Sequence, residues 1–526
     1  CTAPTMSPRA VMMHWKRHFR AHLRPTRPSL RAWTSDWRAK EKPTNSERIL
    51  DIRHNGSAGA GLLYNCAATR DLEAFYAESL QPHALMERAG LAVAKLAMAV
   101  APHAQVVWIP CGPGNNGGDG YEAAKHLKHW GKTPIVTRLQ NSKELPTDAA
   151  IAYREAVAAG VLFADTAPEQ YDLCVDALFG IGHVRDLNDR CSAWIQQINS
   201  RVAPVLAVDI PSGLDTDTGA GARLYVRANY TLSLLTLKPG LFTADGRDAC
   251  GDIWFNSLET TAPANACAQL NRPSLPDDRA HNTHKGSYGD VCVIGGSSSM
   301  AGAALLAARA ALHGGAGRVY VGLLTPSTTH LDRGQPELMF RDPLTLAIES
   351  MAVVAGCGGG NAIHAHLPRI LAQAERLVLD ADALNAVAQD AKLQDLLAAR
   401  AANTTVLTPH PLEAARLMNT SSKDIQSNRL HLAQVLAERF ACTVVLKGSG
   451  TIITAPGQLA RVNTTGNARL ATAGTGDVLA GMIGARLAAG SDAFSSACES
   501  VFRHGQVADA WDSTATMTAQ DLIQAI

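Results

Sequence analysis

Residues 112–120 bring together residue types that could bind an anion or a sugar hydroxyl. They read Gly-Pro-Gly-Asn-Asn-Gly-Gly-Asp-Gly and lie between an apolar run at 106–110 and a helical pattern from Tyr121. A strand, a glycine-rich turn and a helix start point backbone N–H groups at a ligand from the positive end of a helix. The side chains of Asn116 and Asp119 add hydrogen-bonding groups and possible metal ligands. The simpler alternative is a tight turn that needs glycine for a positive φ, and the density of polar residues favours ligand binding over it.

Two further acids end apolar runs in the same half of the chain. Asp176 ends the run from Leu173, and Asp209 ends the run from Val205, shortly before Ser212. Parallel strands present their carboxyl ends at one edge of a sheet, and open α/β folds bind ligands at that edge. Acids placed there could hold a hard cation through oxygen atoms, or one of them could act as an acid or base. Each acid by itself could equally cap a helix or accept a hydrogen bond from a turn.

The second half offers polar segments suited to a phosphate ligand. Residues 447–451 read Lys-Gly-Ser-Gly-Thr after an apolar run, and residues 473–477 read Ala-Gly-Thr-Gly-Asp before a helix rich in small residues. A glycine turn at a helix start binds an anion, and Asp477 beside it could take the proton of a hydroxyl group. The alternative for Asp477 is that it only caps its helix. For His410, in Thr-Pro-His-Pro-Leu-Glu at 408–413, an ordinary loop or core histidine is an equal alternative.

Short apolar runs that alternate with helical patterns position these segments. We expect strands in the first half at 106–109, 135–137, 173–179, 205–211, 231–237 and 253–255, with helices at 71–80, 84–100 and 148–159. We expect parallel strands in the second half at 291–294, 319–323, 351–355, 377–380, 405–407 and 443–446, with helices at 302–313, 424–440 and 478–489. This alternation is typical of α/β domains. The predicted organisation is an N-terminal extension at 1–60, a first domain at 61–264, a Pro-containing linker at 265–280 and a second domain at 281–526.

The bulk composition limits the possible partners. A chain of 526 residues is too long for one core, and its net charge of +1 gives no general attraction to nucleic acid or to an acidic membrane. No apolar run is long enough for a transmembrane helix. The 11 cysteines are scattered singly, which favours a reducing, cytoplasmic location over a disulfide framework. The basic residues 1–45 could be a transit peptide or a nucleic-acid arm, but we favour a disordered tail that is not part of the folded protein.

The motifs of the first half resemble those of the NAD(P)H-hydrate epimerase family over roughly residues 62–264. The glycine-rich stretch is followed by Asp-Ala-Leu-Phe-Gly at 176–180 and by Asp-Ile-Pro-Ser-Gly at 209–213. The resemblance implies a Rossmann-like three-layer αβα sandwich, a catalytic role for Asp209 in moving protons, and K⁺ ligands at Asn116, Asp176 and Ser212. It implies substrate contacts at Asn115, Asn116, Gly117, Gly118, Asp119, Gly180, Ile181, Gly182, His183, Val184, Arg185, Asp186 and Asp209. Arg185 departs from the family pattern, in which glycine is common at this place.

The second half resembles the ADP-dependent NAD(P)H-hydrate dehydratase family, which has a ribokinase-like αβα fold, over roughly residues 275–526. The resemblance implies a catalytic base at Asp477 and contacts with the hydrate from Ala303, Gly358, His410 and Asp477. It implies that ADP, carrying Mg²⁺ on its phosphates, is bound by Lys447, Gly448, Ser449, Gly450, Thr451 and Gly476. Two places depart from the family: Gly-Cys-Gly-Gly-Gly at 356–360 stands for Gly-Pro-Gly-Leu-Gly, and Leu412 stands for glycine.

The two resemblances together predict a bifunctional enzyme that repairs NADH-hydrate and NADPH-hydrate. The first domain would interconvert the R and S epimers, and the second would dehydrate the S epimer with ADP. The helices rich in small residues favour assembly into a homo-oligomer. One alternative is a ribokinase-like small-molecule kinase with a regulatory nucleotide-binding N-terminal domain. Another alternative is a binding protein that uses the first half as a scaffold and binds a partner through its Arg-rich tail.

Overall fold

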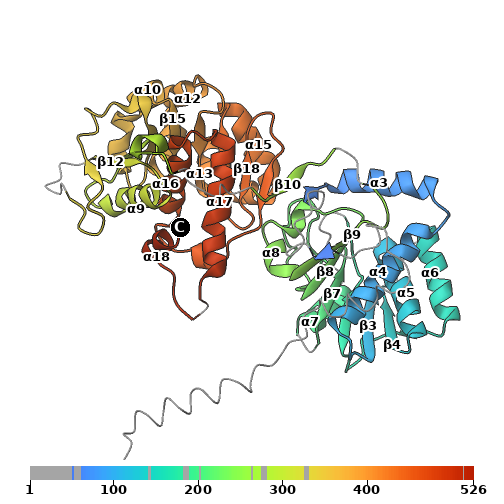
Figure 1. Ribbon diagram of the computed structural model, residues 1–526. Helices are drawn as coiled ribbons and strands as arrows, with labels where there is room; N and C mark the ends of the chain where they lie inside the picture. Colours follow the sequence, from blue (N-terminus) through green and yellow to red (C-terminus); the bar gives the residue numbers. More distant parts are fainter. Residues whose placement is uncertain are drawn as a thin grey trace, which may run out of the picture. The chain divides into compact units, whose positions relative to one another are not determined.

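The computed structural model describes two α/β sheets (Figure 1). The described residues are 50–51, 61–139, 144–181, 189–200, 203–261, 265–273, 281–324, 331–512 and 514–526. Most of the predicted N-terminal extension, and with it the tail at 1–45, lies outside these residues. Among the described residues, no helix combines the length and the apolar character needed to cross a membrane.

The first sheet runs in the order β1-β9-β8-β7-β6-β3-β4-β5, and only the β1–β9 pair is antiparallel. From β5 to β9 this is the strand order of the doubly wound dinucleotide-binding fold, in which the first strand, here β3, is central. The strands are β1 (Leu50–Asp51), β3 (Val106–Cys111), β4 (Thr133–Arg138), β5 (Leu162–Ala164), β6 (Leu173–Asp176), β7 (Val205–Val208), β8 (Tyr230–Leu234) and β9 (Asp252–Asn256).

Helices cover both faces of this sheet because successive side chains of its buried strands point to opposite faces. On β3, Val107 and Ile109 belong to a core with α4, α5 and α6, whereas Trp108 packs with α7 on the other face. The elements between the strands are α3 (Cys66–Ser79), α4 (Ala84–Val100), α5 (Asn115–His129), α6 (Thr147–Ala158), α7 (Asp189–Asn199), α8 (Gly246–Ala249) and the 3-10 helix η3 (Pro239–Leu241).

The second sheet runs in the order β13-β12-β11-β14-β15-β16-β17-β18-β19-β10-β2. Its strands from β13 to β17 are parallel, and the antiparallel pairs are β17–β18, β18–β19 and β10–β2. The strands are β2 (Leu62–Leu63), β10 (Ala268–Asn271), β11 (Asp290–Gly295), β12 (Arg318–Leu323), β13 (Met339–Phe340), β14 (Ala352–Ala355), β15 (Arg376–Leu379), β16 (Thr405–Leu407), β17 (Thr443–Leu446), β18 (Ile452–Thr454) and β19 (Arg461–Asn463).

This sheet is also sandwiched between two helical layers. Val293 and Val354 face α9, α16 and α17, whereas Ile294 and Val353 face α10 to α13 and α15. The α-helices are α9 (Ala301–His313), α10 (Leu367–Gln373), α11 (Asp382–Gln389), α12 (Ala391–Ala398), α13 (Pro411–Met418), α14 (Ser422–Ser427), α15 (Arg429–Phe440), α16 (Thr475–Ala488), α17 (Ala493–Ala510) and α18 (Ala519–Gln524). The 3-10 helices are η4 (Lys285–Tyr288), η5 (Ile348–Ser350), η6 (Gly360–Ala365) and η7 (Ala468–Leu470). The predicted fold class, two α/β units built on parallel sheets, is confirmed.

Three local predictions differ from the structure. The helix expected at 424–440 is two helices, α14 and α15, that meet at Asn428, whose backbone is not helical (φ −150°, ψ 56°). Within the stretch expected as a linker, Ala268–Asn271 form β10 and pair with β19. The helix expected to start at Tyr121 starts at Asn115, so the Asn-Asn-Gly-Gly-Asp segment is helical and not a turn.

Except for Gly114, which has nothing within 4 Å of an added Cβ atom, the glycines of residues 112–120 are required for close packing and not for a left-handed backbone. None of them has a positive φ. A Cβ atom on Gly112 would lie 1.7 Å from the Leu178 carbonyl oxygen, and one on Gly117 would lie 2.1 Å from the Gly112 carbonyl oxygen. A Cβ atom on Gly120 would lie 2.6 Å from that of Ala177. These glycines let α5 lie directly on the carboxyl ends of β3 and β6.

Candidate functional site

The first candidate site lies at the start of α5. Gly114 is the N-cap residue, and no side chain of the described residues caps the helix, so its first N–H groups are available to a ligand. Asn115 is exposed, and its Nδ2 donates to Glu73 Oε1 at 3.2 Å. Asn116 lies against Gly180, where a Cβ atom would be 2.8 Å from Asn116 Oδ1. The structure thus brings Asn116 together with Gly180, two of the predicted substrate contacts.

Asp209 lies on the same edge of the sheet in an unusual backbone conformation. It follows β7 and has a φ of +69°, a left-handed value that costs free energy for a residue with a Cβ atom. The Lys238 ammonium hydrogen-bonds and ion-pairs with Asp209 Oδ1. The backbone N–H of Leu234 donates to the same oxygen at 3.1 Å. The carboxylate is therefore held in a fixed position at the cost of backbone strain.

Lys238 is fully buried, which is rare for lysine. Its Nζ donates to Leu234 O at 2.7 Å and to Ser233 Oγ at 3.3 Å, in addition to Asp209. These partners satisfy all three donors of the ammonium group. The sequence analysis did not single out Lys238.

Asp119 shares its surroundings with these groups. Burial raises the pKa of Asp119 well above its usual range, and the nearby carboxylates of Glu73 and Asp209 raise it further, while Lys238 opposes the rise. Burial likewise raises the pKa of Glu73, and the hydrogen bond from Asn115 opposes that change. Three acids and one lysine therefore gather at this edge, an arrangement suited to proton transfer.

Asp176 and Ser212, two of the predicted K⁺ ligands, are in direct contact. Asp176 is fully buried and accepts hydrogen bonds from Ser212 Oγ at 2.7 Å, Ser212 N at 2.8 Å and Leu178 N at 3.3 Å. Burial raises the pKa of Asp176 to about 6, while the hydrogen bonds from Ser212 oppose the rise. Among the described residues, no basic side chain forms an ion pair with this carboxylate.

These observations fit a cation beside Asp176. A buried carboxylate with only neutral partners is stabilised by a bound cation, and Ser212 Oγ and Asn116 Oδ1 are oxygen donors of the type that hard cations prefer. Asn116 Nδ2 is buried and has no hydrogen-bond partner among the described residues. Phe179 connects the group, since its N–H donates to Ser212 Oγ at 2.9 Å and it directly precedes Gly180, which lies against Asn116.

The loop after Gly180 is described only at its start. Ile181 O accepts a hydrogen bond from Arg70 Nη2 at 3.4 Å. The other predicted substrate contacts of this loop lie outside the described residues; they are Gly182, His183, Val184, Arg185 and Asp186.

The second candidate site is built around a lysine–aspartate pair at the carboxyl ends of β15 and β17. Lys447 Nζ donates to Asp380 Oδ1 at 2.7 Å, and Thr408 Oγ1 donates to the same oxygen at 2.7 Å. A Cβ atom on Gly476 would lie 3.4 Å from Lys447 Nζ. The predicted nucleotide ligands Lys447 and Gly476 therefore meet where a cationic side chain lies beside the N-terminus of α16, an arrangement suited to binding an anion.

Asp477 lies in the first turn of α16 without capping it, because Gly474, with φ +92°, is the N-cap residue. Its carboxylate hydrogen-bonds with the thiol of Cys357. Burial raises the pKa of Asp477 to about 7, the carboxylate of Asp380 raises it further, and the hydrogen bond from Cys357 and the charge of Lys447 oppose the rise. A carboxylate with a pKa near 7 is well suited to accept a proton at neutral pH.

The glycine-rich loop at 447–451 is supported from behind by Arg429. This arginine is almost fully buried, and its Nη2 donates to the carbonyl oxygens of Leu446, Lys447 and Gly450 at 3.2, 3.3 and 3.4 Å. A Cβ atom on Gly448, whose φ is +133°, would lie 2.9 Å from Arg429 Nη1. Ser449 and Thr451 belong to the same loop, and Thr451 Oγ1 donates to Gly448 O at 3.1 Å.

Of the predicted contacts with the hydrate, the structure brings Ala303 and Gly358 together, and it places His410 beside Glu413. Ala303 lies beside Gly358, where a Cβ atom would be 2.9 Å from that of Ala303. His410 caps α13, and its Nδ1 accepts from Leu412 N at 3.1 Å, while its Nε2 lies 3.3 Å from Glu413 Oε1. Burial raises the pKa of Glu413 to about 7, and the charge of Lys447 opposes the rise. His410 thus caps α13 and lies beside Glu413, whose carboxylate is close to Lys447 and Asp380.

Sequence reasoning missed several residues of both sites. Asp380 follows the apolar run of β15, so the rule that found Asp176 and Asp209 applies to it too. Glu73, Lys238 and Arg429 lie far from any motif in the sequence, and only tertiary packing brings them to the sites. Cys357 was noticed as a departure from a family pattern, but its contact with Asp477 was not foreseen.

The comparisons with known proteins match both halves. The family described as YjeF-related protein N-terminus matches residues 82–240, and the family described as NAD(P)H-hydrate dehydratase matches residues 291–526. The chain is 37% identical to the bifunctional NAD(P)H-hydrate repair enzyme Nnr of Escherichia coli K12, over 84% of this chain and 88% of the relative. It is 35% identical to the bifunctional NAD(P)H-hydrate repair enzyme of Leishmania braziliensis, over 85% of this chain and 89% of the relative.

Among solved structures, the chain is similar to the ADP/ATP-dependent NAD(P)H-hydrate dehydratase of Bacillus subtilis, co-crystallised with ATP and Mg²⁺. The identity is 28% and the TM-score 0.39, with 47% of this chain and 91% of the other covered. Each of these two relatives matches more than four fifths of this chain and of its own length. The chain therefore belongs to the family of bifunctional NAD(P)H-hydrate repair enzymes.

Proposed function

We propose that this protein restores hydrated NADH and NADPH, epimerising the hydrate in its first domain and dehydrating the S epimer in its second. The observation that carries the proposal is the presence, in one chain of this family, of two separate acid-bearing sheet edges. One has Asp209 paired with Lys238, and the other has Asp477 beside Lys447 and Asp380. Two chemically different sites suit two successive reactions on one substrate.

In the first site, the hydrate binds along the start of α5 at Asn115 to Asp119, with Gly180 and the loop that follows it. Asp209 moves protons during epimerisation, and Lys238 positions its carboxylate. A potassium ion, held by Asn116, Asp176 and Ser212, would supply positive charge next to the substrate. The buried carboxylate of Asp176, which has only neutral partners among the described residues, supports this assignment.

In the second site, Asp477 accepts the proton of the ring hydroxyl while the hydroxyl oxygen attacks the terminal phosphorus of ADP. The bond between that phosphorus and the bridging oxygen breaks, and AMP leaves. The phosphate ester then leaves the ring as inorganic phosphate, and a proton is lost from the neighbouring carbon, so that the ring double bond is restored. Phosphorylation is needed because hydroxide is a poor leaving group.

The nucleotide would bind to the loop of Lys447, Gly448, Ser449, Gly450 and Thr451 and to Gly476, while Ala303, Gly358 and His410 face the hydrate. Mg²⁺ would neutralise the phosphates of ADP. The oxygen atoms of Asp380 and Asp477 lie within 4.8 Å of each other and of Cys357 Sγ, and this donor set fits a hard cation through its two carboxylates. We further propose a homo-oligomeric, cytoplasmic enzyme.

The test incubates the purified protein with an equal mixture of R and S hydrates of NADH, with ADP, Mg²⁺ and K⁺. Complete recovery of NADH absorbance, with formation of AMP and phosphate, is expected. No recovery, together with a stable phosphorylated product from another alcohol, would support the small-molecule kinase instead.

A further inference from the structure

A cavity on the first sheet lies on the opposite side of α5 from Asp209. In the strand order β7-β6-β3-β4-β5, Asp209 follows β7, the glycine-rich segment follows β3, and Arg138 ends β4. β7 and β4 are three strand spacings apart, about 14 Å at about 4.8 Å per spacing. An elongated ligand that crosses the start of α5 from Asp209 would reach the end of β4.

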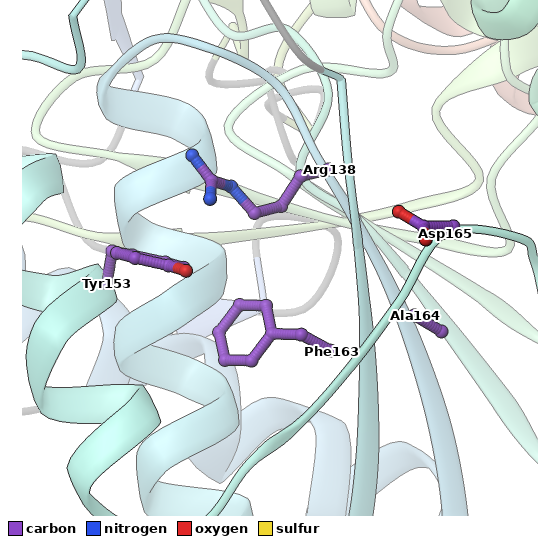
Figure 2. Close-up of a pocket in the computed structure, with 5 residues that line it drawn as sticks. All are labelled: Arg138, Tyr153, Phe163, Ala164 and Asp165. Carbon is purple, nitrogen blue, oxygen red and sulfur yellow. The ribbon is translucent and has the colours of Figure 1, made fainter.

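The cavity has a volume of about 200 Å³ and is lined by Arg138, Tyr153, Phe163, Ala164 and Asp165. Figure 2 shows the guanidinium group, the two aromatic rings and the carboxylate arranged around one space. The guanidinium carbon of Arg138 lies 4.2 Å from the centre of the Tyr153 ring, and the rings of Tyr153 and Phe163 are 5.1 Å apart in an edge-to-face arrangement. These contacts fix the plane of Arg138.

The hydrogen-bonding capacity of Arg138 is only partly used. It hydrogen-bonds with the hydroxyl of Tyr121. Its Nε is buried and donates no hydrogen bond within the described part of the chain. Among the described residues no carboxylate forms an ion pair with it. A planar guanidinium group that is held against an aromatic ring and has unused N–H donors is suited to bind a phosphate group or to stack on a nucleobase.

The position of Arg138 narrows the choice of ligand. In sheets of this order, the turn after the first strand holds the pyrophosphate of a dinucleotide, and the end of the second strand lies beside the adenosine ribose. Here β4 is that second strand, and its last residue pairs in register with Cys111, the last residue of β3. An arginine at this place accommodates a 2′-phosphate, whereas an acid accepts hydrogen bonds from the free ribose hydroxyl.

We propose that this cavity binds the adenosine end of the hydrated dinucleotide and that Arg138 contacts the 2′-phosphate of NADPH-hydrate. Tyr153 and Phe163 form the wall beside the adenosine. Asp165, at the other side of the cavity, repels the phosphate and so favours the orientation in which it faces Arg138. The inference rests on the proposed epimerase function of the first domain and adds a preference for NADPH-hydrate over NADH-hydrate in that step.

The main experiment compares the wild type with Arg138→Ala and Arg138→Lys in the full-length chain. Epimerisation of NADPH-hydrate and of NADH-hydrate is followed by chromatographic separation of the epimers. For Arg138→Ala we expect KM for NADPH-hydrate to rise about tenfold or more, as for loss of a hydrogen bond to a charged group. We expect KM for NADH-hydrate to change much less, kcat to stay the same for both, and Arg138→Lys to recover part of the loss. Equal changes for the two substrates, or no change, would overturn the proposal.

Two further measurements show whether a negative result means that this inference is wrong. One detects misfolding of the variant, and the other tests the cavity independently of the proposed function. Dehydration of the S epimer by the second domain, in the same preparation, reports whether the variant chain is intact. Calorimetric binding of adenosine 2′,5′-bisphosphate and of 5′-AMP tests the cavity without any turnover. If the wild type does not epimerise the hydrate, the proposed function fails. The cavity assignment still stands if Arg138→Ala weakens binding of adenosine 2′,5′-bisphosphate more than binding of 5′-AMP. The assignment is wrong if the variant binds the bisphosphate as tightly as the wild type does.

Discussion

The two sites use similar glycine-rich sequences for different physical purposes. Near the start of α5, Gly112, Gly117 and Gly120 have no positive φ and no space for a Cβ atom, so they let the helix contact β3 and β6. At the start of α16, Gly474 has a φ of +92° and forms the turn itself. Both arrangements present free N–H groups at a helix N-terminus on the carboxyl edge of a parallel sheet. The same letters in a sequence therefore do not indicate the same local structure.

The sites also differ in where the lysine is placed. In the first site Lys238 is paired directly with Asp209, the proposed catalytic acid. In the second site Lys447 is paired with Asp380, and Asp477 keeps a pKa raised to about 7 by burial and by Asp380. In the second site, Asp477 is thus suited to accept a proton at neutral pH. In the first site, the carboxylate of Asp209 is instead held in place by its ion pair with Lys238. This difference predicts that the two activities can be removed and tuned independently.

The largest expected effect comes from reciprocal amide substitutions. Asp477→Asn removes the base that accepts the hydroxyl proton, so dehydration should fall by about 10³-fold while epimerisation is unchanged. Asp209→Asn should lower epimerisation by a similar factor, again about 10³-fold, and leave dehydration of the S epimer intact. The readout is the recovery of NADH from a mixture of epimers with ADP. Asp209→Asn should recover only the S half rapidly, and Asp477→Asn should recover none.

Loss of both activities in either variant would contradict two independent sites. Asp390→Asn is a suitable control for the second site, because Asp390 caps α12 by accepting a hydrogen bond from Lys392 N at 2.9 Å, a role that asparagine can keep.

The next effect concerns the cation of the first site. Replacing K⁺ by a bulky organic cation should lower epimerisation by about 10- to 100-fold, the range seen when the surroundings of a metal site are disturbed. Ser212→Ala should give a similar loss because it removes an oxygen donor and a partner of Asp176. Dehydration under saturating Mg²⁺ and ADP should change little in both cases. An epimerisation rate that is independent of the monovalent cation would refute the assignment of Asn116, Asp176 and Ser212.

The sequence was sufficient to predict the strands that carry these ligands. Buried parallel strands such as β6 and β14 are continuous apolar runs in the sequence. Where such a run ends at an acidic residue, that residue is expected at the carboxyl edge of the sheet, where α/β folds bind ligands. The same argument placed Asp176 and Asp209 correctly on one edge. The sequence interpretation was wrong at the start of α5. The glycines there were expected to form a turn, but they allow the helix to contact the strands.

Long-range packing set the limit of sequence reasoning. Lys238 reaches Asp209 only because the backbone turns back after β8, so that the lysine contacts both Leu234 O and Asp209. No sequence motif indicates that this lysine is buried. Glu73 contacts Asn115 across α3 and α5, and Arg429 supports a loop that follows β17. The antiparallel strands β18 and β19, each three residues long, were not predicted.

The two kinds of glycine should respond differently to alanine. Gly112→Ala places a Cβ atom 1.7 Å from a backbone oxygen, so the strand–helix junction must move, at a cost of about 1–3 kcal/mol or more. Gly474→Ala strains a left-handed residue by about 1–2 kcal/mol. It also brings a Cβ atom 2.6 Å from Leu306 Cδ1, a flexible side chain. Hydrogen exchange measured by mass spectrometry should show faster exchange over α5 in the first variant and over α16 in the second.

Equal protection of both helices in both variants would show that the glycines are interchangeable in role. Gly457→Ala serves as the control, because Gly457 has a φ of +73° but nothing lies within 4 Å of an added Cβ atom. It should therefore show the cost of the backbone conformation alone, in a loop away from both sites.

The smallest expected effect is a shift in the pH dependence of dehydration. Because Asp477 must be deprotonated to act as a base and its pKa is raised to about 7, the rate should fall about tenfold per pH unit below that value. The thiol of Cys357 stabilises the carboxylate, so Cys357→Ala should raise the pKa of Asp477 and move this acid limb to higher pH. At pH 6.5 the variant should be a few-fold slower than the wild type, and at pH 8.5 the two should be equal. Cys357→Ser keeps a hydrogen-bond donor and should retain the wild-type profile. A profile for Cys357→Ala that matches the wild type would mean that the thiol does not tune the base. Epimerisation should be unaffected throughout, since its acid is paired with Lys238 and not with a thiol.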